Sequence, residues 1–288
     1  EVDPLCTVHL SNHTGYPKGW RGQVFSATDL EDVVNGLREN EILEQYTHVL
    51  SGYCRDPNAL HFIADLVDEL KQKKREGRGE GGGRNGVVEY VCDPVMGDDG
   101  KLYVPVEVAN VYRDVVVRKA DVVRLNNTEA ETLLSAPASR DRRQVRTIPE
   151  AVRAAEDICK MGPKTVVITM QESSNSSSTP QHHCVDLGDD LIHVIGCSSG
   201  RRWGTSVPRI PRYYSGTGDL VTSLLLAWIA RGDEPWVACD KALRSIRSIL
   251  QKTHSADSTE LLLIQSRDDI IAPPQSQSFT PPMEYHFF

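Results

Sequence analysis

The segment SGTGDLVTSLLLAW, residues 215–228, combines residue types that can hold an anion and accept a proton. The start of a helix exposes backbone N–H groups that have no partner within the helix, and their dipoles add up to a partial positive charge. Glycine there lets an anion approach the backbone closely, because no Cβ stands in the way. Gly216, Thr217 and Gly218 are therefore predicted to form an anion hole that suits a phosphoryl group in transit.

Asp219 follows these residues and would lie beside the anion hole in the first turn of the helix. Its carboxylate can accept the proton of an attacking hydroxyl group as that oxygen bonds to phosphorus. The competing interpretation is an ordinary helix cap behind a glycine turn. The GxGD pattern is short, and it is neither a Walker A loop nor a dinucleotide-binding fingerprint.

Two further polar clusters would lie at strand ends. CDPVMGDD contains Asp93 and Asp98, and carboxylates suit Mg²⁺, which prefers oxygen ligands and keeps several waters. NNTEAE contains Asn126 and Glu129, which can hold a hydrated cation or phosphate oxygens. The same residues also fit an ordinary helix N-terminus with acids in its first turn. Three such clusters, all between a strand and a helix, favour a metal–nucleotide site.

The elements that would position these clusters alternate along the chain. Strands are predicted at residues 6–10, 48–53, 87–95, 120–126, 165–170 and 191–196, and helices at 27–40, 58–74, 147–162 and from 217 onward. Strands that alternate with helices indicate βαβ units and an α/β fold with a mainly parallel sheet. In such sheets ligands bind beyond the carboxyl ends of the strands, where the polar clusters fall.

Composition narrows the class of protein. The chain has 288 residues, 39% of them hydrophobic and 25% charged, which predicts one soluble globular domain. A net charge of −8 argues against a nucleic-acid partner, and no apolar run reaches the roughly 20 residues of a membrane span. The seven cysteines are single and odd in number, which favours reduced thiols and a cytoplasmic protein.

Some stretches are irregular. Residues 75–86 are rich in Gly and Arg, residues 171–181 form a polar insertion, and residues 272–288 are predicted to be a disordered tail. The HHC stretch at 182–184 is half of a metal pattern, but no second ligand pair has matching spacing, so a surface loop is favoured. We therefore expect one domain over residues 1–271 with two flexible insertions.

The order of the motifs resembles the ribokinase-like superfamily and, within it, the pyridoxal kinases. The segments that carry the resemblance are LSNHTGY (10–16), GYCRD (52–56), YVCDPVMGD (90–98), MGPKTVVIT (161–169), GTGDL (216–220) and ELLLIQSRDDI (260–270). The resemblance covers residues 1–271 and implies a three-layer α-β-α sandwich. It also implies transfer of the ATP γ-phosphoryl group to the 5′-hydroxymethyl of pyridoxal, pyridoxine or pyridoxamine.

The resemblance assigns roles by motif position. It implies that Asp219 is the general base beside the anion hole and that the chain is a homodimer that needs Mg²⁺ and a monovalent cation such as K⁺. Asp93, Asp98 and Glu129 would lie near the magnesium and the phosphates. The nucleotide would contact Asn126 and Thr169, and the vitamer side would comprise Thr14, Tyr53 and Tyr103, with His13 and Trp20 close by.

Two departures from the family pattern stand out. The chain starts at Glu1 within what resembles the second strand of the family, so we expect a fragment or, failing that, a divergent inactive form. Arg124 in RLNNTEAE stands where the family has a threonine that helps with the cation and phosphate. An arginine there can pair with phosphate directly or crowd out the metal.

Two alternatives stay open. One is a related small-molecule kinase that acts on hydroxymethylpyrimidine or a sugar, against which SNHTGY and GYCRD argue. The other is a non-catalytic protein that binds the vitamer and nucleotide on the same fold, which the absent first strand and Arg124 favour.

Overall fold

A computed structural model of the chain describes residues 2–12, 14, 16–76, 88–135, 143–171, 191–275 and 283–284. Its centre is a sheet of seven strands in the order β11-β10-β9-β8-β7-β4-β3. The strands are β3 (His48–Ser51), β4 (Glu89–Cys92), β7 (Val122–Asn126), β8 (Thr165–Gln171), β9 (Leu191–Ser198), β10 (Arg201–Pro208) and β11 (Met283–Glu284). Strands β3, β4, β7 and β8 run parallel, whereas β9, β10 and β11 extend the sheet with antiparallel pairs.

Both faces of the sheet are apolar because successive side chains of a strand point to opposite sides. On β8, Val166 and Ile168 join one core cluster, and Val167 between them joins the other. The first cluster packs under α2 (Pro57–Glu76), α5 (Asn127–Leu134), α6 (Ile148–Cys159) and the continuous segment of α3 (Val106–Val111), η2 (Tyr112–Val116) and α4 (Val117–Lys119). The second lies under α7 (Thr217–Ala230) and α8 (Pro235–Ser255).

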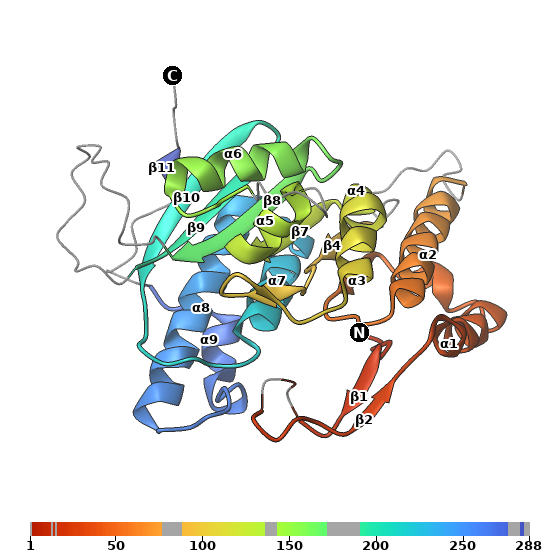
Figure 1. The fold of residues 1–288 in the computed structure, drawn as a ribbon, viewed down its shortest axis with the longest axis horizontal. Coiled ribbons are helices and arrows are strands. Elements are labelled where there is room, and N and C mark those ends of the chain that lie inside the picture. The colour runs from red at the N-terminus through yellow and green to blue at the C-terminus, as the bar shows by residue number, and fades with distance from the viewer. Residues whose placement is uncertain are drawn as a thin grey trace.

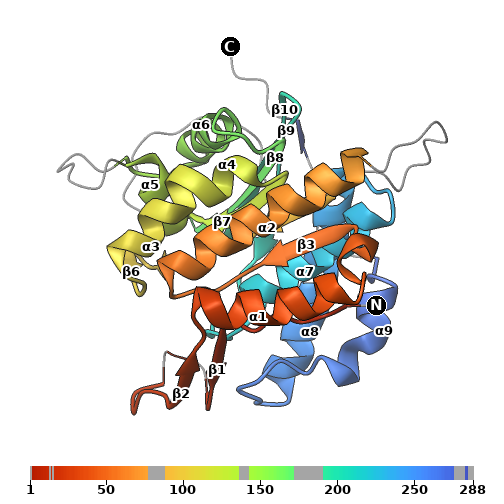
Figure 2. The same cartoon turned by 90° about the vertical axis from the view of Figure 1, so that its right-hand side faces the viewer.

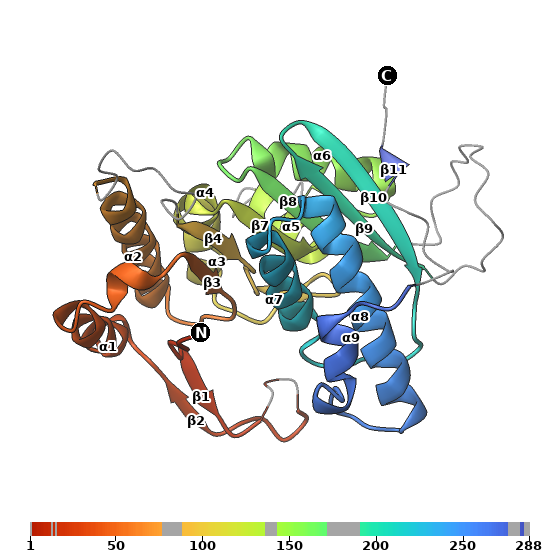
Figure 3. The same cartoon turned by 180° about the vertical axis from the view of Figure 1, so that it is seen from behind.

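The result is the three-layer α-β-α sandwich that the family resemblance implies. Figure 2 shows the two helix layers on opposite sides of the sheet, and Figure 3 shows α7 and α8 over its other face. The parallel strands end beside the start of α7, so the residues that follow them gather at one edge.

A short ribbon projects from this sandwich. Strands β1 (Val8–Leu10) and β2 (Gly22–Val24) pair antiparallel with each other and form a sheet of their own. The ribbon extends away from the central sheet in Figure 1. Thr7 Oγ1, just before β1, donates a hydrogen bond at 2.7 Å to the carbonyl of Tyr53, two residues beyond β3. The predicted strand at 6–10 therefore exists, but within the described residues it pairs outside the central sheet.

The remaining elements are small or peripheral. They are α1 (Ala27–Glu39), η1 (Leu43–Gln45), the hairpin of β5 (Gly97–Asp98) and β6 (Lys101–Leu102), η3 (Ile264–Ser266) and α9 (Arg267–Ile271). Helix α1 begins at a capping box in which Ser26 and Asp29 satisfy each other's backbone N–H groups. No helix among the described residues is long and apolar enough to cross a membrane.

The predicted irregular stretches fall largely outside the description. Residues 77–86 of the first insertion, 172–181 of the second and the HHC stretch at 182–184 lie beyond the described residues. Arg75 and Glu76 continue helix α2, and Gln171 ends β8. In the tail that was expected to be disordered, Met283–Glu284 instead pairs with Trp203 and Gly204 of β10.

Candidate active site

The start of α7 has the geometry of an anion hole. Gly216 caps the helix with φ 80° and ψ 2°, a left-handed conformation that favours glycine. The Gly216 carbonyl accepts the first helical bond, from Leu220 N at 3.0 Å, and the Thr217 hydroxyl donates to the Tyr214 carbonyl at 2.9 Å. The N–H groups of the first turn precede the helical ladder and have no acceptor within it. They are therefore free to bind an anion.

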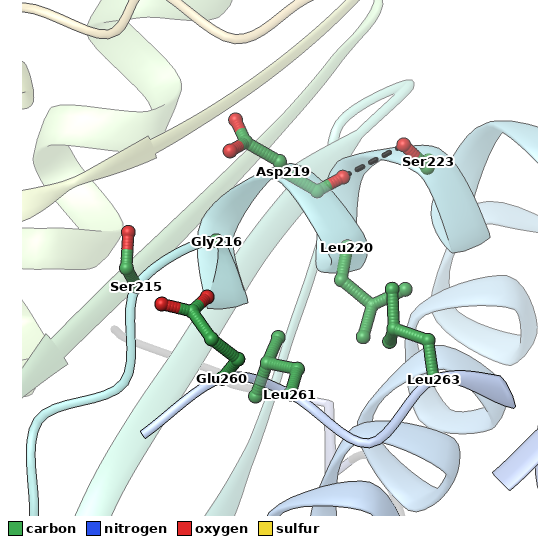
Figure 4. Close-up of a pocket in the computed structure, with 8 residues that line it drawn as sticks. All are labelled: Ser215, Gly216, Asp219, Leu220, Ser223, Glu260, Leu261 and Leu263. Carbon is green, nitrogen blue, oxygen red and sulfur yellow. Dashed lines mark hydrogen bonds between the residues drawn. The ribbon is translucent and has the colours of Figure 1, made fainter. Parts of the chain in front are cut away.

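Asp219 is one of the residues that line a cavity of about 410 Å³. The cavity is lined by Ser215, Gly216, Asp219, Leu220, Ser223, Glu260, Leu261 and Leu263. Figure 4 shows α7 on one side of it and the segment with Glu260 on the other. Asp219 is exposed, and its backbone carbonyl, rather than its carboxylate, accepts the bond from the Ser223 hydroxyl at 2.7 Å. The carboxylate of the expected base thus faces solvent-accessible space.

Asp93 lies directly after β4 and is only 2% exposed. The Thr222 hydroxyl, one turn into α7, donates to Asp93 Oδ2 at 2.6 Å, whereas Asp93 Oδ1 is buried and has no hydrogen-bond partner among the described residues. Burial raises the pKa of Asp93, the nearby Arg124 opposes the rise, and Asp219 adds to it. The two acids that the sequence placed in one site are therefore close enough to interact.

Arg124 occupies the space between the strand ends and the start of α7. Its Nη1 lies 3.7 Å from Asp93 Oδ2, and its Nη2 donates to Thr169 Oγ1 at 3.0 Å. A Cβ added at Gly218 would lie 2.8 Å from the same Nη1. The guanidinium therefore touches the anion hole, and glycine at 218 leaves room for it.

Asn126 and Glu129 form the capping box that starts α5. The Asn126 side chain accepts from Glu129 N at 2.9 Å and donates to the Gly97 carbonyl at 2.8 Å. Both oxygens of Glu129 accept backbone bonds, Oε1 from Met96 N at 3.1 Å and Oε2 from Asn126 N at 2.8 Å. The pKa of Glu129 is raised by burial and by the neighbouring Asp93. These two residues thus lock β7, α5 and the β5–β6 hairpin together.

Asp98, the third acid predicted to lie near the metal, is exposed rather than buried. Asp98 lies in the β5–β6 hairpin with an exposed side chain, and its Oδ1 accepts from Asp99 N at 3.0 Å. The hairpin is tight, since a Cβ at Gly97 would lie 2.3 Å from the Lys101 carbonyl oxygen. Asp98 therefore stands at the solvent side of the site, whereas Asp93 and Glu129 are buried.

Aromatic residues of the expected vitamer side share one arginine. Arg55 Nη1 donates to the Tyr53 phenol oxygen and to the Tyr103 carbonyl, both at 3.3 Å. Partial burial and the charges of Glu129 and Asp98 raise the pKa of Tyr103. Arg55 thus links the Tyr53 phenol to the Tyr103 backbone, and the vitamer-binding role of both tyrosines stays a prediction.

The β1–β2 loop reaches the other wall of the cavity. Tyr16 OH donates to Glu260 Oε1 at 3.3 Å, although the two residues are far apart in sequence. Thr14 and Trp20 lie in the same loop and are half-buried, whereas His13 lies outside the described residues. Arg55, Thr222 and Glu260 had no role predicted from the sequence, although they lie in the quoted segments GYCRD, SGTGDLVTSLLLAW and ELLLIQSRDDI.

The donor set fits a magnesium ion that is held mainly by phosphates. Among the described residues no group of three or more His, Cys, Asp or Glu side chains could hold a metal by itself. The unpartnered, buried Asp93 Oδ1 is nevertheless an oxygen that a cation would satisfy, and Asp98 is exposed nearby. Mg²⁺ bound through one or two carboxylates plus substrate phosphates needs no more than this.

Comparisons with known proteins agree with one another. A family model described as Phosphomethylpyrimidine kinase matches residues 83–261. The chain is 34% identical over 281 residues to the pyridoxal kinase of Dictyostelium discoideum, which covers 93% of this chain and 85% of that protein. It is also 34% identical to the pyridoxal kinase of Homo sapiens, over 95% of this chain and 86% of the relative.

Solved structures give the same result. The pyridoxal kinase from Leishmania donovani in complex with ADP and pyridoxamine superposes with a TM-score of 0.78 at 28% identity. That match covers 96% of this chain and 87% of the other. A putative phosphomethylpyrimidine kinase from Bacteroides thetaiotaomicron, in a crystal form with pyridoxal, superposes with a TM-score of 0.74 at 26% identity. The similarity therefore extends over nearly the whole described fold.

Proposed function

Because this chain belongs to the pyridoxal kinase family, we propose that it transfers the γ-phosphoryl group of ATP to the 5′-hydroxymethyl group of pyridoxal, pyridoxine or pyridoxamine. The ribokinase-like fold that the sequence predicts is confirmed. One observation carries the proposal: Thr222 of α7 binds Asp93 at the end of β4, so the helix that carries Asp219 is fixed over the strand ends. A base, an anion hole and buried charges of both signs then share one site.

The chemistry assigned to this chain's residues is positioning and proton transfer. Asp219 would accept the proton of the vitamer hydroxyl as that oxygen attacks phosphorus. The N–H groups at Gly216, Thr217 and Gly218 would hold the migrating phosphoryl oxygens, whose negative charge the helix start favours. Thr169 accepts from Arg124 and keeps its own hydroxyl proton for a nucleotide phosphate oxygen. Preorganised donors of this kind supply the largest part of such catalysis.

Mg²⁺ would be held by Asp93 and Asp98 together with the donor phosphates. When bound, it would neutralise charge on the phosphate oxygens. Glu129, predicted as a third ligand, has both oxygens engaged by backbone N–H groups, and we assign it the role of fixing Asn126 and the β5–β6 hairpin. Asn126 holds the same hairpin through the Gly97 carbonyl and keeps one amide hydrogen for a phosphate.

The vitamer would lie between the β1–β2 loop and the aromatic pair. Tyr53 and Tyr103 would offer ring faces for a pyridine, and Arg55 links the Tyr53 phenol to the Tyr103 backbone carbonyl. Thr14 and Trp20, with His13 as a prediction from sequence alone, would close the other side. The Tyr16–Glu260 hydrogen bond supports this arrangement because it joins the loop to the wall of the Asp219 cavity.

An acceptor panel tests the proposal. The chain, with ATP and Mg²⁺, is given pyridoxal, pyridoxine, pyridoxamine, hydroxymethylpyrimidine and a hexose, and ADP and the phosphorylated product are identified by mass spectrometry. We expect equimolar ADP and a vitamer 5′-phosphate. Absence of phosphorylated vitamer, while another acceptor is phosphorylated, would contradict the substrate assignment.

Hydroxymethylpyrimidine is the second candidate acceptor because the matching family model is described as a phosphomethylpyrimidine kinase. The panel decides between the two acceptors directly. Calorimetry separates both from a non-catalytic binder, since binding of pyridoxal and ADP without any product would favour the binder.

Assembly and location stay predictions from sequence. A homodimer is implied by the resemblance, and light scattering on the purified chain would measure it. The six cysteines within the described residues are all free, which is consistent with the predicted reducing, cytoplasmic setting.

A further inference from the structure

Arg124 is a buried cation held at the phosphate end of the site. Its side chain is 12% exposed, and it is the middle residue of β7, which pairs in parallel with β8. The register sets Asn126 opposite Thr169, so Arg124, which lies two residues before Asn126 on β7, reaches diagonally to the Thr169 hydroxyl. The position of its charge is therefore fixed by the sheet itself.

Two oxygen atoms next to the Arg124 guanidinium are of the type that an alkali cation binds. They are a buried carboxylate oxygen of Asp93 at 3.7 Å from Nη1 and the Thr169 hydroxyl at 3.0 Å from Nη2. The guanidinium already lies against both, and a second positive charge in the same space would be repelled by it. The monovalent cation implied by the resemblance therefore does not fit this site.

The same guanidinium also faces the anion hole. Its Nη1 lies 2.8 Å from the point where a Cβ of Gly218 would be, so no side chain separates it from the first turn of α7. Its Nε is buried and has no hydrogen-bond partner in the part of the chain that the structure describes. Arginine presents several donors in a fixed plane and binds phosphate oxygens in pairs, which a spherical ion does not.

From these contacts we propose that Arg124 replaces the monovalent cation of this site, binding the donor phosphates with its own charge, so that nucleotide binding and turnover do not depend on K⁺ or Na⁺. The turnover part rests on the proposed kinase function. The binding part rests on the geometry alone, so the two can fail separately.

The experiment compares the chain with R124T in KCl, NaCl and tetramethylammonium chloride at equal ionic strength, with Mg²⁺ throughout. ADP and adenosine affinities are measured by calorimetry, and vitamer phosphorylation in parallel. For the unchanged chain we expect ADP affinity and turnover to agree within about twofold in all three salts. In tetramethylammonium, R124T should lose about 10-fold to 100-fold in ADP affinity, as expected for lost charge-assisted bonds, and part of it should return in KCl.

Adenosine distinguishes a phosphate role from a structural one. Loss of a merely structural arginine would weaken ADP and adenosine alike, whereas we expect adenosine affinity to stay unchanged in R124T. R38T is the matched control, because Arg38 is also ion-paired, with Glu69, but it lies on α1. It should behave as the unchanged chain in every salt.

Two results would overturn the proposal. One is a fall of about 10-fold or more in the ADP affinity or turnover of the unchanged chain when K⁺ is replaced by tetramethylammonium. The other is tighter ADP binding by R124T in every salt, which would mean that Arg124 blocks the phosphate position. If R124T does not fold, R124K and the salt series on the unchanged chain decide, since R124K keeps the charge and should stay salt-independent.

Discussion

The phosphate side and the vitamer side of the site are built in different ways. On the phosphate side, Asp93 and Glu129 are each 2% exposed, and three of their four carboxylate oxygens accept hydrogen bonds, from the Thr222 hydroxyl and from backbone N–H groups. On the vitamer side, Tyr16 and Tyr103 are 48% and 44% exposed, and Tyr16 is held by one bond. The phosphate side is therefore a buried hydrogen-bonded network, whereas the vitamer side is an exposed, adaptable wall with few hydrogen bonds.

This difference determines how each side should respond to substitution. Buried charges cost free energy unless they are paired, so removing one member leaves its partner unsatisfied. Effects in such a network are coupled and not additive, whereas exposed residues with separate partners act nearly independently.

Asp219→Asn should have the largest effect on turnover. The variant keeps the shape of the side chain and loses the base, so kcat should fall by about 10²-fold to 10⁴-fold. ADP affinity should hardly change, because the backbone N–H groups remain. Steady-state kinetics and calorimetry measure the two quantities. Retained turnover would show that the proton is accepted elsewhere.

Gly218→Ala tests the contact between α7 and the buried network. The new Cβ would lie 2.8 Å from Arg124 Nη1, so the guanidinium must move, and ADP affinity should fall by about 10-fold. Gly36→Ala is the matched control, because nothing lies within 4 Å of its added Cβ. It should leave binding unchanged and stabilise α1 by up to about 1 kcal/mol. Equal ADP affinity in both variants would contradict the packing.

Thr222→Val should destabilise the chain and lower turnover together. It removes the donor to Asp93 Oδ2, and the free energy of unfolding should fall by about 1–3 kcal/mol. Ser223→Ala, on the same helix, removes an exposed hydroxyl that bonds the Asp219 carbonyl, and should cost less than about 0.5 kcal/mol. Urea unfolding measures the free energy lost in each variant. Similar losses in the two would mean that the Thr222–Asp93 hydrogen bond stabilises the chain no more than the exposed Ser223 bond does.

Glu129→Gln tests the protonation of the buried network on the phosphate side through the pH dependence of the free energy of unfolding. Burial and Asp93 raise the pKa of Glu129, so the folded chain holds this proton more tightly than the unfolded chain. Its contribution to stability is full below the ordinary carboxyl pKa and is lost as pH rises through the raised value. From pH 5 to 8 the unchanged chain should therefore lose about 1–2 kcal/mol relative to Glu129→Gln. If the two chains differ by the same free energy of unfolding, measured in urea, across this pH range, the raised pKa of Glu129 is contradicted.

Tyr16→Phe should have the smallest effect. It removes one exposed hydrogen bond, from the β1–β2 loop to Glu260, so the vitamer KM should rise by about two- to fivefold with kcat unchanged. The urea midpoint should not move. A fall in kcat with constant KM would instead place Tyr16 in the chemical step, against the view of an adaptable wall.

The sequence predicts the parallel half of the sheet well because each strand there is a short apolar run that is followed by a polar cluster. Strand β10 was not predicted, since Arg201, Arg202 and Gly204 interrupt its pattern. Its Trp203 packs against Gly196 of β9, where a Cβ would lie 2.0 Å from the ring. That fit depends on strand pairing, which local pattern does not reveal.

The same limit applies to the site. GTGDL and the acidic clusters place Asp219, Asp93 and Asn126 at one edge from sequence alone. The bonds between them depend on register and on contacts across many residues, as for Thr222 with Asp93 and Tyr16 with Glu260. NTEAE fitted both a metal ligand and a helix start, and the capping box of Glu129 is present.

The most direct measurement is a crystal structure of the chain with ADP, Mg²⁺ and pyridoxamine. The account predicts the vitamer 5′-oxygen within about 2.6–3.2 Å of the Asp219 carboxylate. It also predicts the terminal phosphate of ADP between the first turn of α7 and Arg124. A vitamer bound with its 5′-oxygen turned away from Asp219, or a nucleotide whose phosphates leave the start of α7 empty, would contradict it.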